Sequence, residues 1–227
     1  MIVSGAVPEG DLLPRESQLA SRFRVSRQAV REALKVLAAK GLVASRRRAG
    51  TSVLPRANWN LLDPDVIAWY PVDRVSADFL EDLIEIRRAI EPAAAIHAAT
   101  RGTADAVAAI GEALDVMLAV EKPSEAFFAA DAAFHAAIIA ASGNALFNRL
   151  GIVIRPLMRA SFELHFRAVE AALVEPARIA DAVRLSLERH GEVYAAIRGR
   201  DPARALAAME ALLAQVATEV DLATGRV

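Results

Sequence analysis

The chain has 227 residues, no cysteine and a formal net charge of −1, and 55% of its residues are hydrophobic. This apolar content excludes a disordered chain, and the lack of cysteine excludes a disulfide framework and a thiolate metal cluster. No run of about 18 uncharged apolar residues occurs, and residues 1–10 do not form a secretory signal. We therefore expect a cytoplasmic protein without a membrane span, and its abundant alanine favours a mainly α fold.

The net charge is small because two blocks of the chain carry opposite charges that nearly cancel. Residues 1–56 hold 11 Lys and Arg against 4 Asp and Glu, which gives a formal charge of +7. Residues 57–227 hold 16 against 24, which gives −8. A basic module of this size indicates a polyanionic partner, and its binding to phosphates would depend on salt.

The basic block, residues 1–56, is expected to begin with two helices. Apolar residues at helical spacing predict a short amphipathic helix over 16–23 and a second helix over 27–40. Ser26 is a good N-cap for the second helix, and Gly41 ends it as a C′ residue. Two strands are expected at residues 42–46 and 51–54, with the turn between them. Helix, short turn, helix and basic β-hairpin together predict a winged helix-turn-helix that binds double-stranded DNA.

The polar face of the second helix carries side chains that suit base readout. Arg27 and Arg31 lie one turn apart, and arginine can hold guanine O6 and N7 with two hydrogen bonds, whereas Gln28 can read adenine. The wing arginines suit phosphates or the minor groove. The alternative is a solvated basic face without a specific partner. The predicted DNA-binding residues are Ser26, Arg27, Gln28, Arg31, Lys35, Arg47, Arg48 and Gly50.

The motifs of this block resemble the winged-helix signature of GntR-type bacterial transcription regulators. They are Leu13-Pro14-Arg15-Glu16, the run from Val25 to Leu34, Gly41-Leu42-Val43 and Gly50-Thr51. The resemblance covers nearly all of residues 5–54 and implies that Ser26, Arg27, Gln28, Arg31 and the wing-tip Gly50 touch the operator. The family usually has another helix before Gly5, so the resemblance implies that the first helix is truncated here.

The acidic block is expected to be all-helical. Residues 57–75 predict a linker with a short helix, and residues 76–227 predict an antiparallel bundle of six to seven helices. Capping residues and prolines mark the helix starts. The expected starts are Asp63-Pro64, Ser76, Thr103, Pro123-Ser124, Asn144, Glu175-Pro176 and Asp201-Pro202, with an interruption of the second helix at Glu91-Pro92 and an Asn144 helix reaching about Leu173.

Polar residues on apolar helix stripes mark a candidate site in this bundle. Arg87 interrupts an apolar stripe and should point inward. Asp131 and His135 are four residues apart and can reach one point, which suits two ligands of a divalent metal, and His190 can supply a third. The alternative is an ordinary surface Asp–His pair. No catalytic residue is predicted, because no general base or nucleophile stands beside these residues.

These positions also resemble the FCD effector domain of the FadR branch of GntR regulators. The run 87–92, Asp131 to His135, Ser142-Gly143-Asn144 and His190 follow the order of that domain over about residues 76–220. The resemblance implies a divalent metal, most often zinc, held by Asp131, His135 and His190 and joined by a small carboxylate effector. Leu212 stands where relatives carry a fourth ligand, a histidine, and a leucine cannot bind metal. The metal is therefore held by three residues with effector or water, bound weakly, or absent. If it is absent, the same three residues could hydrogen-bond the hydroxyls of a ligand whose carboxylate Arg87 holds with two bonds.

Residues 54–69 resemble the linker of FCD regulators of sugar-acid catabolism, the galactonate regulator among them, which implies a sugar-acid effector. We therefore predict a homodimeric, effector-controlled repressor of a catabolic operon. One alternative is a metal-dependent hydrolase or lyase using Asp131, His135 and His190. Another is a DNA-architectural protein without a ligand, which a packed bundle without a polar site would favour.

Overall fold

The computed structural model describes residues 1–46, 50–63, 65–66, 69, 77–120, 124–152, 155 and 176–224. The chain forms two compact units, Met1–Arg74 and Val75–Val227. The predicted fold class is confirmed, because a small two-stranded sheet accompanies helices in the first unit and the second unit is helical throughout its described residues.

In the first unit, helix α1 (Glu16–Phe23) and helix α2 (Arg27–Ala39) are joined by a tight connection. Arg24 adopts the left-handed conformation that ends α1. The hydroxyl of Ser26 accepts a hydrogen bond from the backbone N–H of Ala29 at 3.1 Å, as expected of an N-cap. Gly41 follows α2 with φ +75°, and Asn58 approaches it so closely that a Cβ atom would not fit.

Strands β1 (Val43–Arg46) and β2 (Gly50–Val53) pair antiparallel, with Val43 opposite Val53 and Arg46 opposite Gly50. The short 3-10 helix η1 (Arg56–Asn58) follows. A small core forms where the sheet meets this segment, and the Trp59 indole donates a hydrogen bond to the Leu54 carbonyl at 2.9 Å. The core consists of Leu42, Val43, Val53, Trp59 and Val66.

Asp63 caps the helical residues 65–66 near the end of this unit. Its carboxylate accepts hydrogen bonds from the backbone N–H groups of Asp65 and Val66, which confirms it as a cap. The ammonium group of Lys40, at the end of α2, lies 2.6 Å from Asp63 Oδ1 and 2.9 Å from Asp65 Oδ2. One lysine therefore joins α2 to both Asp63 and Asp65.

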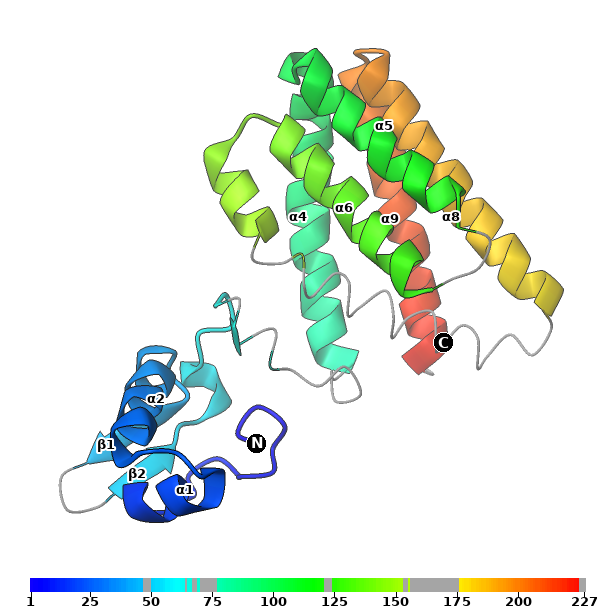
Figure 1. Cartoon of the computed structure of the whole chain (residues 1–227). Helices are drawn as coiled ribbons and strands as arrows, with labels where there is room; N and C mark the ends of the chain where they lie inside the picture. The colour runs from blue at the N-terminus through cyan, green and yellow to red at the C-terminus, as the bar shows by residue number, and fades with distance from the viewer. Residues whose placement is uncertain are drawn as a thin grey trace. The chain divides into compact units, whose positions relative to one another are not determined.

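The second unit is an antiparallel helix bundle (Figure 1). Helix α4 packs on α9, α6 and α8, while α5 packs on α6 and α8, and α8 packs on α9. Gly111 of α5 leaves room for the Tyr194 ring of α8, which would meet any Cβ at that position. The helices of this unit are α4 (Ala77–Arg101), α5 (Ala104–Leu118), α6 (Glu125–Ala141), α8 (Pro176–Arg198) and α9 (Pro202–Thr224), and among the described residues 145–152 are also helical.

The helix starts follow the capping signals of the sequence. Thr103 and Ser124 accept hydrogen bonds from the third residue after them, at 3.2 and 3.3 Å. Asn144 and Asp201 cap the segments that they precede. Local side chains therefore set where each of these helices begins, as predicted.

One expectation about the bundle is wrong. Helix α4 runs without a break from Ala77 to Arg101 with Pro92 inside it, whereas the sequence predicts an interruption at Glu91-Pro92. Pro92 is buried in a helix that packs on three others, so tertiary packing outweighs the intrinsic cost of an internal proline. Other expectations lie outside the described residues, namely the turn at 47–49, the predicted helix-start residues Pro64, Ser76, Pro123 and Glu175, and the Asn144 helix over 153–154 and 156–173.

Among the described residues, no helix has both the length and the apolar character needed to cross a membrane.

Candidate functional site

The predicted base-reading residues lie together on exposed positions of α2. Ser26, Arg27, Gln28, Arg31 and Lys35 are all exposed. Arg27 is the first residue of the helix, so it lies at the end that a recognition helix presents to base edges. We call Arg27, Gln28, Arg31 and Lys35 the recognition face.

Two glutamates accompany this face. Glu32 accepts hydrogen bonds from Gln28 Nε2 at 3.0 Å and from Lys35 Nζ at 2.9 Å. Glu16, the first residue of α1, accepts from Arg31, and this contact lowers the pKa of the Glu16 carboxyl and raises the pKa of Arg31. Sequence reasoning did not assign either glutamate a role, although Glu32 lies at helical spacing from Gln28.

The wing is described in part. Gly50 is exposed and has φ +96°, which a residue with a side chain rarely adopts. It pairs with Arg46 at the end of the two strands. Arg47 and Arg48, the two predicted wing contacts, lie outside the described residues.

The bundle brings the predicted effector residues together in its interior. Arg87 comes from α4, Asp131 and His135 come from α6, and His190 comes from α8. Each is buried, and the exposed fraction is 0% for Arg87 and 4% for Asp131. Residues from three helices therefore meet in one buried polar cluster, which consists of Arg87, Glu91, Asp131, His135 and His190.

Asp131 lies between the two histidines. Its Oδ1 atom is 2.7 Å from His190 Nε2 and 3.8 Å from His135 Nε2. Burial alone would raise the pKa of Asp131, but the contact with His190 and the charges of His190, His135 and Arg87 hold that pKa below its usual range. The carboxylate is therefore ionised in the folded protein.

Glu91 completes the cluster, and sequence reasoning missed it. Its carboxylate lies 2.7 Å from Arg87 Nε through Oε1 and 2.6 Å from His135 Nδ1 through Oε2. Burial opposes its ionisation, but Arg87 and His135 together lower the pKa of Glu91 to about 2. The available signal was its position four residues after Arg87, which places both on one helix face.

The donor set fits a divalent metal ion. One ligand atom from each of Asp131, His135 and His190 lies within 4.8 Å of the other two, and two imidazoles with a carboxylate suit zinc. His190 Nε2 is buried, and although it is close to Asp131 it makes no well-aligned hydrogen bond. Leu212 on α9 is buried and offers no ligand atom, so three side chains could hold the ion and leave a position for a small ligand.

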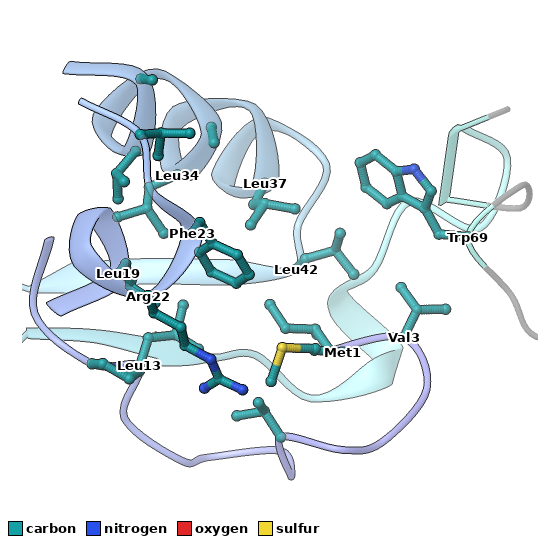
Figure 2. A pocket seen from close by; sticks show the side chains of 17 residues that line it. Met1, Val3, Leu13, Leu19, Arg22, Phe23, Leu34, Leu37, Leu42 and Trp69 are labelled. Carbon is teal, nitrogen blue, oxygen red and sulfur yellow. The ribbon is translucent and has the colours of Figure 1, made fainter. Parts of the chain in front are cut away.

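The first unit contains a separate apolar cavity of about 580 Å³ (Figure 2). Side chains of α1, α2 and the N-terminal segment line it, among them Leu19, Arg22, Phe23 and Leu34. None of the predicted effector or metal residues lines this cavity, so it is unrelated to the buried polar cluster.

Both parts of the chain match known protein families. Residues 1–53 match the bacterial regulatory proteins of the gntR family. Residues 82–215, more than half of the chain, match the FCD domain. The first match contains the recognition face, and the second contains all five residues of the buried polar cluster.

The chain is also similar to named regulators. It is 34% identical over 200 residues to the galactonate operon transcriptional repressor of Escherichia coli, covering 88% of this chain and 83% of that protein. It is 32% identical over 220 residues to the transcriptional regulator LutR of Bacillus subtilis, covering 95% and 94%. The solved structure of a Streptococcus agalactiae GntR protein superposes with a TM-score of 0.51 at 27% identity, covering 92% and 90%.

These relatives are transcription regulators and not enzymes, which decides against the hydrolase or lyase alternative. The chain belongs to the GntR family of bacterial transcription regulators and joins a DNA-binding winged helix-turn-helix to an FCD domain.

Proposed function

We propose that this regulator is a homodimeric repressor of a catabolic operon and that a small carboxylate, a sugar acid, binds in the buried polar cluster and releases the operator. Asp131, His135 and His190 would hold a divalent ion, most readily zinc, which would act as a Lewis acid toward an oxygen of the acid. Arg87 would hold the carboxylate with two hydrogen bonds.

The observation that carries the proposal is the buried polar cluster itself. An arginine, two carboxylates and two histidines are expensive to bury unless they pair with one another or with a ligand. A DNA-architectural protein has no need of such a group. Similarity to the galactonate operon repressor supports an aldonate or a related hydroxy acid as the ligand.

The summed charge of the buried polar cluster favours a ligand with one negative charge. A histidine that binds a metal is neutral, so in the metal-loaded site the side chains of Arg87, Glu91 and Asp131 alone sum to −1. A divalent ion would change the sum to +1, and one carboxylate would return it to zero. A buried site is most stable near neutrality, so a monocarboxylate suits the metal-loaded site better than a dicarboxylate.

Burial also suggests how ligand binding would reach the DNA. The cluster residues are at most 4% exposed, so an acid must open the helices around them before it binds. If the acid binds the opened form more tightly than the closed form, acid binding shifts the protein toward the opened form. The two recognition helices of a dimer would then lose the spacing that the operator requires.

Dimerisation through the helical unit is part of the proposal. Several large apolar side chains of that unit are exposed, including Leu146 at 76%. An interface between two copies would bury such side chains, and a two-fold axis would match a pseudo-palindromic operator. Exposed apolar residues of this unit include Val116, Leu118, Leu146 and Ile152. Such a regulator would act in the cytoplasm, where its operator lies.

The test is a thermal-shift screen of sugar acids, with zinc and with a chelator. We expect an aldonate to raise the melting temperature, because a ligand that binds only the folded state stabilises it. We expect the chelator to reduce that shift. An operator selected from random DNA should then dissociate when the same acid is added, as measured by fluorescence anisotropy.

Two matched variants make the screen specific. His135→Ala should lose the response to the acid, whereas His97→Ala, which changes a half-buried histidine outside the cluster, should keep it. A normal response in the His135 variant, or no shift with any acid in folded wild-type protein, would contradict the proposed effector site.

A further inference from the structure

We propose that Glu91 is the positioning residue of the effector site: its carboxylate sets which ring nitrogen of His135 faces the ligand and anchors Arg87 beside it. The inference rests on the proposed function for the identity of the ligands. Glu91 is neither one of the three proposed metal ligands nor one of the residues proposed to bind the acid.

The tautomer of His135 follows from its contact with Glu91. An ionised carboxylate can only accept hydrogen bonds, so Nδ1, at 2.6 Å from Glu91 Oε2, carries a ring proton. Arg87 Nη2 lies 3.2 Å from Nε2 and 3.5 Å from Nδ1, so the guanidinium lies against the ring and does not choose between its nitrogens. In the neutral ring, the proton that Glu91 holds at Nδ1 leaves the lone pair on Nε2, which lies 3.8 Å from Asp131 Oδ1.

His190 shows the same arrangement with a different acceptor. Its Nδ1 atom lies 2.7 Å from the Ser186 carbonyl oxygen, which can only accept, so this nitrogen also carries a proton. Its Nε2 atom faces Asp131. Both histidines are thus held through Nδ1, and both direct Nε2 at one carboxylate, which is how proteins orient imidazoles toward a metal.

Glu91 also fixes one edge of Arg87. Its Oε1 atom lies 2.7 Å from Arg87 Nε, whereas its Oε2 atom lies at 3.5 Å from Arg87 Nη2. The strong contact is therefore at Nε, near the base of the guanidinium. Because Glu91 holds the Nε atom of Arg87, the Nη atoms of Arg87 can turn from His135 to an anionic ligand while the guanidinium keeps its contact with the buried Glu91 carboxylate.

A carboxylate is required at this position. Glutamine has the same shape but one acceptor oxygen, so in Glu91→Gln either His135 or Arg87 loses its acceptor. His135 would then exchange between both tautomers, and only one of them offers Nε2 to a metal. Loss of such an orienting contact typically lowers metal affinity by about 10- to 100-fold.

The first experiment uses the wild-type chain without metal or acid. Nitrogen-15 NMR of histidine-labelled protein at about pH 8 reports the tautomer of each ring, and the His135 signals are assigned by their absence in His135→Asn. We expect a protonated Nδ1 and an unprotonated Nε2. A proton on Nε2 alone would overturn the proposal.

The second experiment compares Glu91→Gln with Glu85→Gln, which removes the same charge at an exposed position of α4. Cobalt(II), as a coloured zinc substitute, is titrated into each protein and into wild type. We expect about 10- to 100-fold weaker binding and mixed His135 tautomers in Glu91→Gln only. Wild-type affinity together with a wild-type tautomer in that variant would overturn the proposal.

The two experiments separate this inference from the proposed function. If wild-type protein binds neither metal nor acid, the proposed function fails, and the His135 tautomer still decides whether Glu91 orients the ring. If wild type binds both ligands but His135 carries its proton on Nε2, the proposed function stands and the role of Glu91 is refuted.

Discussion

Arg31 of the recognition face donates to Glu16 of α1, with Nη2 at 2.9 Å from Oε2 and Nε at 3.4 Å from Oε1. The sequence assigns Arg31 to base reading, yet in the free protein its guanidinium already binds a carboxylate. Both side chains are exposed, so the pair is weak and can be exchanged for a contact with DNA.

We expect Glu16→Gln to raise operator affinity roughly two- to fivefold, because Arg31 would no longer have to leave an ion pair before it reaches a base. Arg31→Ala should lower the affinity at least about fivefold. Fluorescence anisotropy at fixed salt measures both changes. Glu9→Gln removes the same charge at an exposed position of the same unit, so an equal gain there, or a loss in Glu16→Gln, would contradict the role given to Arg31.

Local signals predicted most of the fold. Ser26, Thr103 and Ser124 cap helices as expected because an N-cap depends on only the next few residues. The continuity of α4 through Pro92 was not predictable in the same way. A proline lowers helix stability wherever it occurs, and only the packing of α4 in the bundle shows that the helix tolerates it.

The candidate site was predictable in part. Asp131 and His135 share one helix, so their proximity follows from helical spacing. His190 lies on another helix and was proposed as a third ligand from its residue type and supported by family resemblance, because no local pattern joins α6 to α8. Glu91 was missed because an arginine and a glutamate four residues apart usually form a solvated pair, and burial of both depends on tertiary packing.

The contact between Lys40 and Asp63 predicts a pH dependence for the first unit. Asp63 has a lowered pKa, first through its hydrogen bond from Lys40 and also through the backbone N–H groups of Asp65 and Val66. A carboxyl group whose pKa is lower in the folded state stabilises the fold at pH values above its usual pKa, which is 3.8 for Asp63. That contribution to the free energy of unfolding is lost as the pH falls through the lower folded-state pKa. We expect wild type to lose melting temperature more steeply than Asp63→Asn between about pH 5 and pH 3.

Circular dichroism at several pH values measures this difference. Asp11→Asn, a change at an exposed aspartate of the same unit, is the matched control and should keep the wild-type slope. Parallel curves for wild type and Asp63→Asn would show that the Lys40 contact adds nothing to the folding of this unit.

Leu212→His should strengthen metal binding if the fourth ligand position of the family is preserved in this chain. Leu212 is 1% exposed on α9, which packs on both α4 and α8. A fourth ligand should raise cobalt affinity at least tenfold, or about 1.4 kcal/mol. A shift of the cobalt absorption bands would report the added nitrogen. Leu213→His, a change at the next buried residue, should bring no gain, and equal affinities for all three proteins would place Leu212 outside the site.

Metal and acid should bind cooperatively, because Arg87 lies against the His135 ring that would bind the metal. Arg87 Nη2 is 3.2 Å from His135 Nε2 and 3.5 Å from His135 Nδ1, and a metal ion on Nε2 would repel the guanidinium from that ring. Metal binding would thus turn a guanidinium N–H toward the carboxylate of the acid. Couplings of this kind are typically 5- to 150-fold, and each ligand must raise the affinity for the other by the same factor.

Calorimetric titration of the acid with and without zinc, and of zinc with and without the acid, measures both factors. Arg87→Lys keeps the positive charge beside Glu91 but loses the two parallel N–H donors of the guanidinium. The coupling between zinc and acid affinities should therefore fall, while zinc still binds. Arg88→Gln changes the exposed neighbour on α4 and should leave the coupling intact. If zinc leaves the affinity for the acid unchanged in wild type, Arg87 does not connect the two ligands.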